Sequence, residues 1–188
     1  MQDRRATLLA EAETLVRGRG YSGFSYADLA EVVGIRKASI HHHFPTKTDL
    51  AVALLASYAE RYAGELEAII AASEDGLRRV LAYADLYLQG VERGLGCLCA
   101  ALAAERDILP ERIRVDLGRF FAEHIGWLER VLREGQANGT VRSGIEPAPF
   151  ARMIVAALEG ALMMERFAGG AAGFRDTLAA LEQGLRPG

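Results

Sequence analysis

The fold is decided by residues 24–50, which read FSYADLAEVVGIRKASIHHHFPTKTDL. Ser25 precedes an apolar run, and Asp28 follows three positions later, which is the spacing of a capping box at a helix start. Gly34 can end that helix, because glycine adopts a left-handed backbone at little cost. The pattern predicts a short helix between Ser25 and Gly34 with an apolar inner face.

A second short helix is expected over residues 36–43, and Pro45 ends it. Ile40 and Phe44 are four positions apart and can pack together on the first helix. The polar residues of the segment are left to face outward; they are Arg36, Lys37, Ser39, His41 and His42. Two short helices, a glycine-containing turn and a basic outer face are typical of a helix-turn-helix, which enters the major groove of DNA.

The outward residues suit contacts with a duplex. Arginine and lysine pair with guanine edges or phosphates, and serine or histidine can donate to either. Thr46, with Asp49 three residues later, is expected to cap the next helix, and backbone N–H groups at such helix starts attract phosphate. The predicted DNA-binding set is Ser25, Tyr26, Arg36, Lys37, Ser39, His41, His42, Thr46 and Lys47.

Three consecutive histidines, His41, His42 and His43, invite comparison with a metal site. Neighbours on a helix point about 100° apart, so the three rings cannot converge on one ion. DNA-contact or structural roles are favoured over metal binding, with His43 packing the turn, and no metal or cofactor is predicted.

At this point the sequence resembles the TetR/AcrR family of transcriptional regulators. The matching positions follow an apolar first helix and are Phe24, Leu29-Ala30, Gly34-Ile35, Ile40 to Phe44, and Lys47 with Leu50. The match covers roughly the first quarter of the chain. It implies a DNA-binding domain followed by an all-helical domain for ligand binding and dimerisation. The chain departs from the family pattern at His41, where a phosphate-contacting Tyr is usual, and at Tyr26, where Thr is usual.

Composition favours the same class. Half of the 188 residues are apolar, aromatic residues are few, and the abundant residues are helix formers. The predicted fold is all-α with about nine helices, divided into a DNA-binding domain over residues 1–48 and an effector and dimerisation domain over residues 49–188. Residues 1–50 carry seven basic and six acidic side chains, whereas the chain has a net charge of −3. A weakly basic tip on an acidic body fits a DNA reader, although a preference for arginine over lysine elsewhere would give a similar count.

The remaining helices are expected over residues 2–18, 46–72, 74–92, 97–107, 111–138, 147–168 and 172–185. Charged residues interrupt each of them, so no membrane span is expected, and no signal peptide precedes the first. The protein is therefore predicted to be soluble and cytoplasmic. The helix over 147–168 is rich in alanine and glycine, which lets another helix approach closely. Together with the last helix it is predicted to form a homodimer interface; packing inside one chain is the alternative.

Aromatic and soft side chains on the later helices suggest a pocket for an unknown small organic effector. The predicted effector-binding set is Tyr58, Tyr62, Tyr87, Cys97, Phe121, His124, Trp127 and Met163. Each of these residues also suits an ordinary core position. The function predicted from the sequence is a homodimeric repressor that a small molecule releases from its operator, with double-stranded DNA as partner.

Three rival functions remain open at this level. Cys97 and Cys99 can make the protein a redox- or electrophile-sensing regulator, although buried unreactive thiols are the simpler reading. Cys97 with His124 can be imagined as a nucleophile and base, but no orienting carboxylate accompanies them, so no enzyme is predicted. A nucleoid-type DNA binder without an effector is the third, and the acidic body argues against it.

Overall fold

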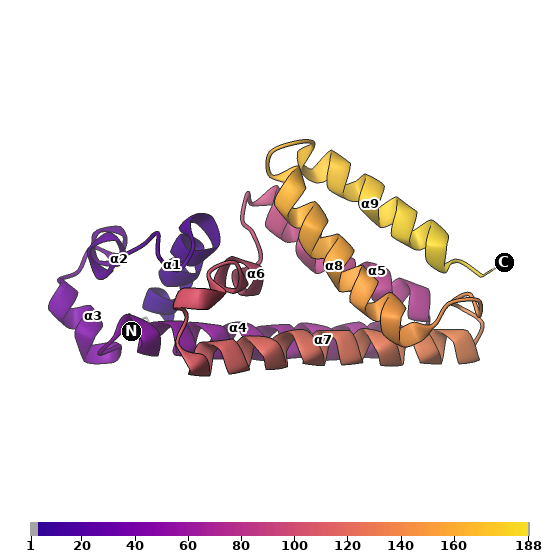
Figure 1. The fold of residues 1–188 in the computed structure, drawn as a ribbon, viewed down its shortest axis with the longest axis horizontal. Coiled ribbons are helices and arrows are strands. Elements are labelled where there is room, and N and C mark those ends of the chain that lie inside the picture. Colours follow the sequence, from indigo (N-terminus) through magenta and orange to yellow (C-terminus); the bar gives the residue numbers. More distant parts are fainter. Residues whose placement is uncertain (1–3, 188) are drawn as a thin grey trace. The chain divides into compact units, whose positions relative to one another are not determined.

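The structure is a computed structural model that describes residues 4–187. These residues fold into α-helices joined by short loops. The helices are α1 (Arg4–Arg19), α2 (Tyr26–Val33), α3 (Lys37–His43), α4 (Lys47–Ala72), α5 (Gly76–Glu92), α6 (Leu98–Ala103), the 3-10 helix η1 (Arg106–Ile108), α7 (Glu111–Ala137), α8 (Pro147–Glu165) and α9 (Gly170–Leu185) (Figure 1). Residues 4–187 contain no strand. The predicted all-α fold with an N-terminal helix-turn-helix is confirmed.

Most helix bounds agree with the sequence prediction to within two or three residues, one bound is untested, and two differences are informative. The predicted start of the first helix at Gln2 lies outside the described residues. The helix expected over residues 97–107 is instead α6 followed by η1. On α5 the predicted inward residues Leu77, Leu81 and Leu88 are half-buried. The fully buried stripe of α5 is Val80, Tyr83, Ala84, Tyr87 and Val91.

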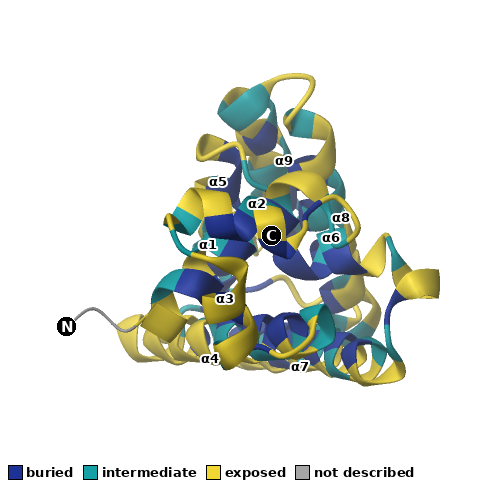
Figure 2. Cartoon of the chain, turned by 90° about the vertical axis from the view of Figure 1, so that its left-hand side faces the viewer, coloured by how far each residue is buried: buried dark blue, intermediate teal, exposed yellow. Residues whose placement is uncertain are grey.

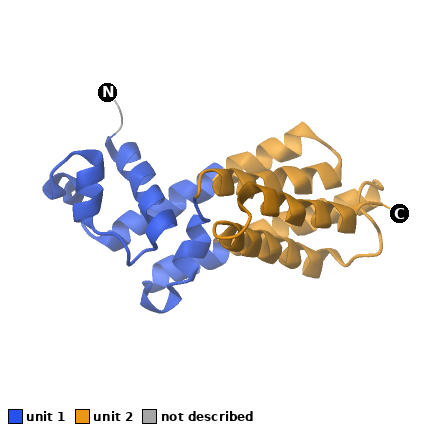
Figure 3. Cartoon of the chain, turned by 90° about the horizontal axis from the view of Figure 1, so that it is seen from above, with its two compact units in different colours: residues 1–61, 95–119 blue, residues 62–94, 120–188 orange. Residues whose placement is uncertain are grey.

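The chain divides into two compact units (Figure 3). Unit 1 comprises residues 1–61 and 95–119, and unit 2 comprises residues 62–94 and 120–188. Helices α4 and α7 therefore each contribute residues to both units. The boundary predicted after residue 48 remains a proposal about how the chain divides by function.

Unit 1 has a core built on the predicted apolar face of α1. The buried residues of that helix are Leu8, Leu9, Ala12, Leu15 and Val16. Ile40 and Phe44 are buried beside them, which confirms the predicted inner face of the second short helix. Helix α6 packs on α1. Arg17 fastens the pair, because its Nε donates to the carbonyl of Gly96 over 2.6 Å.

Unit 2 is organised by α5, α8 and α9, which pack against one another. Helices α5 and α7 approach each other closely at Gly76 and Gly135. A Cβ built on Gly76 would lie 2.6 Å from the Cα of Gly135, so the two backbones touch where neither residue has a side chain. Close by, the buried guanidinium of Arg79 pairs with Glu134 over 2.7 Å and donates to the carbonyl of Ser73 over 2.6 Å.

Helix α8 corrects one expectation from the sequence. Its 19 residues are long and apolar enough to cross a membrane by length and composition, although no such helix was predicted. Only 39% of the apolar stretch of this helix is buried in the structure. The core helix of a soluble protein passes the same test, so the finding is weak evidence for insertion.

Candidate functional site

Helix α2 begins and ends as the sequence predicts. The Ser25 hydroxyl accepts from the backbone N–H groups of Ala27 and Asp28, and the Asp28 carboxylate accepts from the Ser25 backbone N–H over 2.7 Å. This reciprocal pair is a complete capping box. Gly34 has φ of 70° and closes the helix in the left-handed region that favours glycine. The hydrogen bonds from Ser25 hold the pKa of Asp28 below its ordinary value.

Helix α3 exposes almost its whole length. Ile40 is its only buried residue, and Figure 2 shows the rest of the helix mainly in the exposed class. The predicted outward residues are all exposed; they are Arg36 at the N-cap and Lys37, Ser39, His41 and His42 on the helix. Among the described residues, none of the histidines joins a group of three or more ligands that could hold a metal ion.

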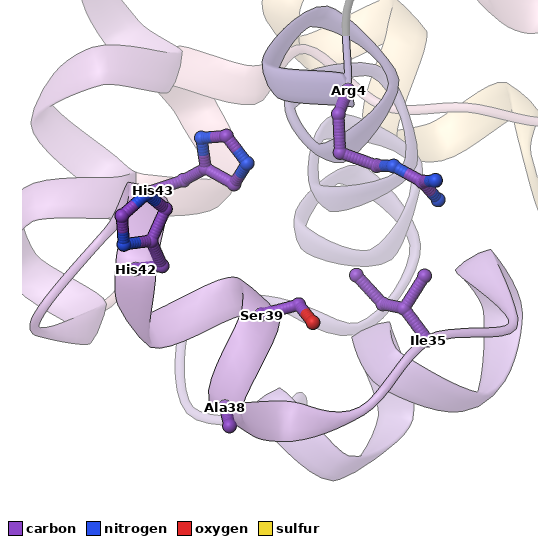
Figure 4. A pocket seen from close by; sticks show the side chains of 6 residues that line it. All are labelled: Arg4, Ile35, Ala38, Ser39, His42 and His43. Atoms are coloured by element: carbon purple, nitrogen blue, oxygen red, sulfur yellow. The ribbon is translucent and has the colours of Figure 1, made fainter.

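A hollow of about 570 Å³ lies between α3 and the start of α1. Its lining residues are Arg4, Ile35, Ala38, Ser39, His42 and His43 (Figure 4). The hollow brings a guanidinium from α1 close to the hydroxyl and imidazoles of α3. Its lining combines donors with apolar Ile35 and Ala38, a mixture that suits the edge of a nucleic-acid groove.

Tyr26 is inside the fold rather than on its surface. The residue is 7% exposed, and its hydroxyl lies 2.9 Å from the carbonyl of Phe44 and 2.7 Å from that of Thr46. Burial, followed by the charge of Asp49, raises the pKa of Tyr26 to about 12, so the phenol keeps its proton. Tyr26 therefore fixes the end of α3 to the start of α4, and we omit it from the proposed DNA contacts.

The start of α4 repeats the arrangement at the start of α2. The Thr46 backbone N–H donates to the Asp49 carboxylate over 2.9 Å, and the Asp49 N–H donates back to the Thr46 hydroxyl over 3.1 Å. Both capping residues, Ser25 and Thr46, are exposed. Their own N–H groups are taken by carboxylates, so a phosphate at either helix start must use the N–H groups that follow.

Lys47 is half-buried and already has partners. Its ammonium donates to the carbonyl of Phe24 and lies 4.7 Å from the ring centroid of Tyr21 and 4.3 Å from that of Phe24. Burial lowers the pKa of Lys47, and the nearby carboxylates of Glu105 and Asp28 oppose that shift. The lysine therefore holds the loop before α2 as well as being a candidate phosphate contact.

A second candidate site lies within unit 2, around Tyr83. The Tyr83 hydroxyl lies 3.1 Å from Nδ1 of His124 and 3.1 Å from the Tyr87 hydroxyl. The Tyr83 ring stacks on Trp127 with centroids 5.5 Å apart, and the ring of Tyr62 lies 5.8 Å from that of His124. Four members of the predicted effector set, Tyr62, Tyr87, His124 and Trp127, are thus brought together by one tyrosine.

This cluster also has polar ends that the prediction did not include. The Tyr87 hydroxyl donates to the carboxylate of Glu159 over 3.4 Å. An acidic residue in the middle of the apolar helix α8 was the available signal. Burial lowers the pKa of His124 to about 4, so the imidazole is neutral near pH 7. Aromatic rings, a neutral imidazole and one carboxylate are side-chain types that suit an organic molecule with an apolar body and a polar group.

The other members of the predicted effector set lie elsewhere. Tyr58 and Cys97 belong to unit 1, where the Tyr58 hydroxyl lies 3.9 Å from the Cys97 sulfur. Phe121 is half-buried beside Phe120, and Met163 is 65% exposed on α8, so Met163 lines no enclosed site.

Both cysteines are thiols outside any disulfide, and both are buried, Cys97 with 7% and Cys99 with 0% exposure. Reactive thiols are usually accessible, so this burial does not favour a sensing role.

Comparisons with known proteins agree with this arrangement. Residues 8–54 match the family described as "Bacterial regulatory proteins, tetR family", and residues 76–181 match "Tetracyclin repressor-like, C-terminal domain". The chain is 31% identical over 163 residues to the HTH-type transcriptional repressor NemR of Escherichia coli (strain K12), covering 85% of this chain and 82% of the relative. It is 24% identical over 160 residues to the HTH-type transcriptional repressor DhaR of Mycobacterium sp. (strain GP1), covering 85% and 80%.

Solved structures give the same assignment. A TetR-family transcriptional regulator from Agrobacterium tumefaciens superposes with a TM-score of 0.93 and 32% identity over 98% of both chains. The C-terminal match alone spans more than half of this chain, and it joins a helix-turn-helix whose polar face is exposed. The chain belongs to the TetR family of bacterial DNA-binding transcriptional regulators.

Proposed function

We propose that the protein is a homodimeric repressor whose α3 helices read two half-sites of an operator and whose unit 2 binds a small organic effector that releases the DNA. One observation carries the DNA-reading part. Five polar residues from Arg36 to His42 are exposed, whereas Ile40 between them is fully buried. Ile40 therefore anchors the helix in the core, and the polar face stays accessible to a duplex. Repression agrees with the names of the relatives NemR and DhaR. The setting that suits this activity is the cytoplasm.

A stripe on α8 supports the dimer. Met153, Met163 and Met164 are 46%, 65% and 60% exposed, and Phe167 just after the helix is 89% exposed. Their spacing, with Ala156 and Gly160 between them, places all of these residues along one side of a helix. Exposed apolar stripes of this kind mark interaction sites, and a second copy of the same stripe is self-complementary. Two copies are also what an operator with two half-sites, about 34–36 Å apart, requires.

The dimer surface has a direct test. Replacing both Met163 and Met164 by Glu places charge on the stripe, and we expect the protein to become monomeric by size-exclusion chromatography with light scattering. Ala122→Glu is the matched control, because it places a charge at an exposed position of α7 in the same unit. A dimer that survives the double substitution would place the interface elsewhere.

The effector part rests on the Tyr83 cluster. A ligand shifts the balance between two conformations only by its different affinity for them. Helices α4 and α7 each contribute to both units, so a change of either helix in unit 2 is carried along its own backbone into unit 1. The ligand proposed for this site is apolar, with a group that hydrogen-bonds to Glu159 or His124.

The decisive experiment offers the purified protein fragments of the genome that encodes it and recovers the bound ones. We expect a few fragments to be retained in a gel shift with excess unrelated DNA at physiological salt, as a specific regulator requires. A variant with both Lys37→Ala and Ser39→Ala should lose this retention. If no fragment survives competition, the protein is not a sequence-specific repressor. Small organic molecules are then screened for release of the best fragment, with Tyr83→Phe as the test of the cluster.

A further inference from the structure

His41 has a hydrogen bond that defines the state of its ring. Its Nδ1 lies 3.1 Å from the backbone carbonyl of Pro45, just beyond the helix end. A carbonyl oxygen can only accept, so the hydrogen bond exists with the proton on Nδ1. In the neutral ring Nε2 is then an acceptor. The residue is exposed, so Nε2 can be approached from outside.

We propose that His41 contacts a DNA phosphate through Nε2 only as the imidazolium, so that duplex binding takes up a proton. A phosphate oxygen is an acceptor and cannot bond to the lone pair of a neutral Nε2. Protonation converts Nε2 into a charged donor while Nδ1 keeps its bond to Pro45. The inference rests on the proposed DNA-reading role of α3 and adds a dependence on pH to it.

The groups around the His41 ring come from four helices. The edge of the ring meets Tyr26 of α2, with centroids 4.9 Å apart, and that phenol stays neutral because its pKa is about 12. The ionisable side chains on α3 and on the elements beside it are Arg4 and Arg5 on α1; Tyr26, Asp28 and Glu31 on α2; Arg36, Lys37, His42 and His43 at and along α3; and Lys47 and Asp49 at the start of α4. Only the two other histidines are of a type that ordinarily changes charge near neutral pH.

The two other histidines are in a different position. His42 and His43 line the hollow that Arg4 also lines, and their rings lie 5.5 Å apart. His41 is absent from that lining and has the carbonyl of Pro45 as its partner. Nδ1 of His41 is therefore engaged by the protein itself, and we assign Nε2 to the phosphate.

The sign and size of the effect follow from linkage. A phosphate beside the ring favours the imidazolium, so DNA raises the pKa of the histidine it contacts. If that shift is one unit, affinity rises about tenfold for each bound protomer as pH falls through the window between the free and bound values. The gain is complete below that window and is lost above it.

The test uses a fluorescein-labelled duplex of about 30 base pairs and mixed sequence, long enough for two half-sites. Phosphate contacts need no operator, so any sequence reports them. Dissociation constants are measured by anisotropy between about pH 8 and about pH 5.5 at constant ionic strength. Circular dichroism at each pH confirms that the protein remains folded.

Four proteins give the answer: the native chain, His41→Gln, His41→Tyr and the matched control His42→Gln. We expect the native chain to bind more tightly at the acidic end by about tenfold for each protomer, and so by about a hundredfold for a dimer. His42→Gln should keep the same ratio between the two ends, whatever its overall affinity. His41→Gln should lose most of that dependence. His41→Tyr should bind at the alkaline end more tightly than the native chain, because a phenol donates without a proton from solvent.

Each remaining outcome counts against the proposal. Equal pH dependence in the native chain and His41→Gln, or its loss in His42→Gln instead, would overturn the role of His41 and leave the DNA-reading function standing. Failure of every protein to bind the duplex at any pH would overturn the inference, because phosphate contacts need no operator. The sequence-specific function is decided separately by the gel shift with genomic fragments.

Discussion

The carboxylate of Glu105 accepts a hydrogen bond from the backbone N–H of Ser22 over 2.9 Å, although 83 positions separate the two residues. The Ser22 hydroxyl donates to the same carboxylate. With the bond from Arg17 to Gly96, this contact fastens the segment around α6 and η1 to α1 and to the turn before α2. Within unit 1, a segment from the middle of the chain thus supports the helix-turn-helix.

Replacing Glu105 by Gln should loosen that turn. Burial favours the neutral acid, but the hydrogen bonds from Ser22 outweigh it and hold the pKa of Glu105 below its ordinary 4.5. Because the folded pKa is the lower one, the stability from this carboxylate is present above pH 4.5 and is lost as pH falls through the folded value. We expect Glu105→Gln to lower the free energy of unfolding at pH 7 by about 1 kcal/mol in urea titrations.

The matched control for Glu105 is Asp107→Asn on η1, which removes a charge from an exposed residue. It should leave the unfolding midpoint in place. An equal loss in both variants would mean that net charge, and not the bond to Ser22, causes the effect.

The two lysines should separate DNA binding from folding. Lys37 is exposed, so Lys37→Ala should leave the melting temperature unchanged and reduce the slope of log affinity against log salt by about one unit. Lys47 is held by Phe24 and two rings, so Lys47→Ala should also lower the free energy of unfolding, by roughly 1–2 kcal/mol. Anisotropy at several salt concentrations and thermal melts of both variants give the comparison. Equal melting temperatures would refute the structural role of Lys47.

His124 should make the fold sensitive to acid. Burial lowers its folded pKa to about 4 from an ordinary 6.5, so the unfolded chain takes up the proton first as pH falls. Stability from the neutral ring is present above pH 6.5 and is lost progressively toward pH 4. The loss is on the order of 2–3 kcal/mol. We expect His124→Gln to be less stable at pH 7 but to show a flatter decline in urea midpoint over that range; an unchanged decline would assign the acid sensitivity to other groups.

Gly135, where α7 approaches α5 closely, should not tolerate an added methyl group. A Cβ on Gly135 would lie 2.5 Å from a methyl carbon of Val141 and 3.1 Å from the Cα of Gly76. We expect Gly135→Ala to lower the free energy of unfolding by roughly 1–3 kcal/mol, measured in urea. Gly64→Ala on α4 is the control, because its Cβ would meet nothing within 4 Å. Gly64→Ala should be neutral or raise stability by about 0.5–1 kcal/mol. An equal loss of stability in both variants would mean that the close approach at Gly135 does not cause the effect.

The helix-turn-helix was predictable in detail because its signals are local. Ser25 with Asp28, and Thr46 with Asp49, are pairs three residues apart at one helix end, so a short stretch of sequence contains both partners. Gly34 signals the helix end by itself. The burial of Ile40 and Phe44 follows from their spacing alone. What the local pattern could not show is Tyr26, whose hydroxyl meets carbonyls 18 and 20 positions away.

The second unit was predicted less well, because tertiary packing decides between patterns that the sequence allows equally. Helix α5 carries two overlapping apolar stripes, and the buried one is that of Tyr83 and Tyr87, whose hydroxyls find partners on other helices. The aromatic members of the predicted effector set share only their residue type, and several of them lie together around Tyr83. Met163 has a suitable residue type as well, but on α8 it is exposed. The direction in which it points depends on the packing of α8 and not on its residue type.

Of the seven residues of helix α3, only Ile40 is buried in the core, and Phe44 just beyond the helix is buried as well. The residues that would meet the bases carry almost none of the folding energy, since surface substitutions usually change stability by no more than about 0.5 kcal/mol. The exposed positions Lys37, Ala38, Ser39 and His42 can therefore change while the scaffold stays intact. A descendant of this gene can acquire a new target sequence by a handful of point changes, without passing through an unstable intermediate.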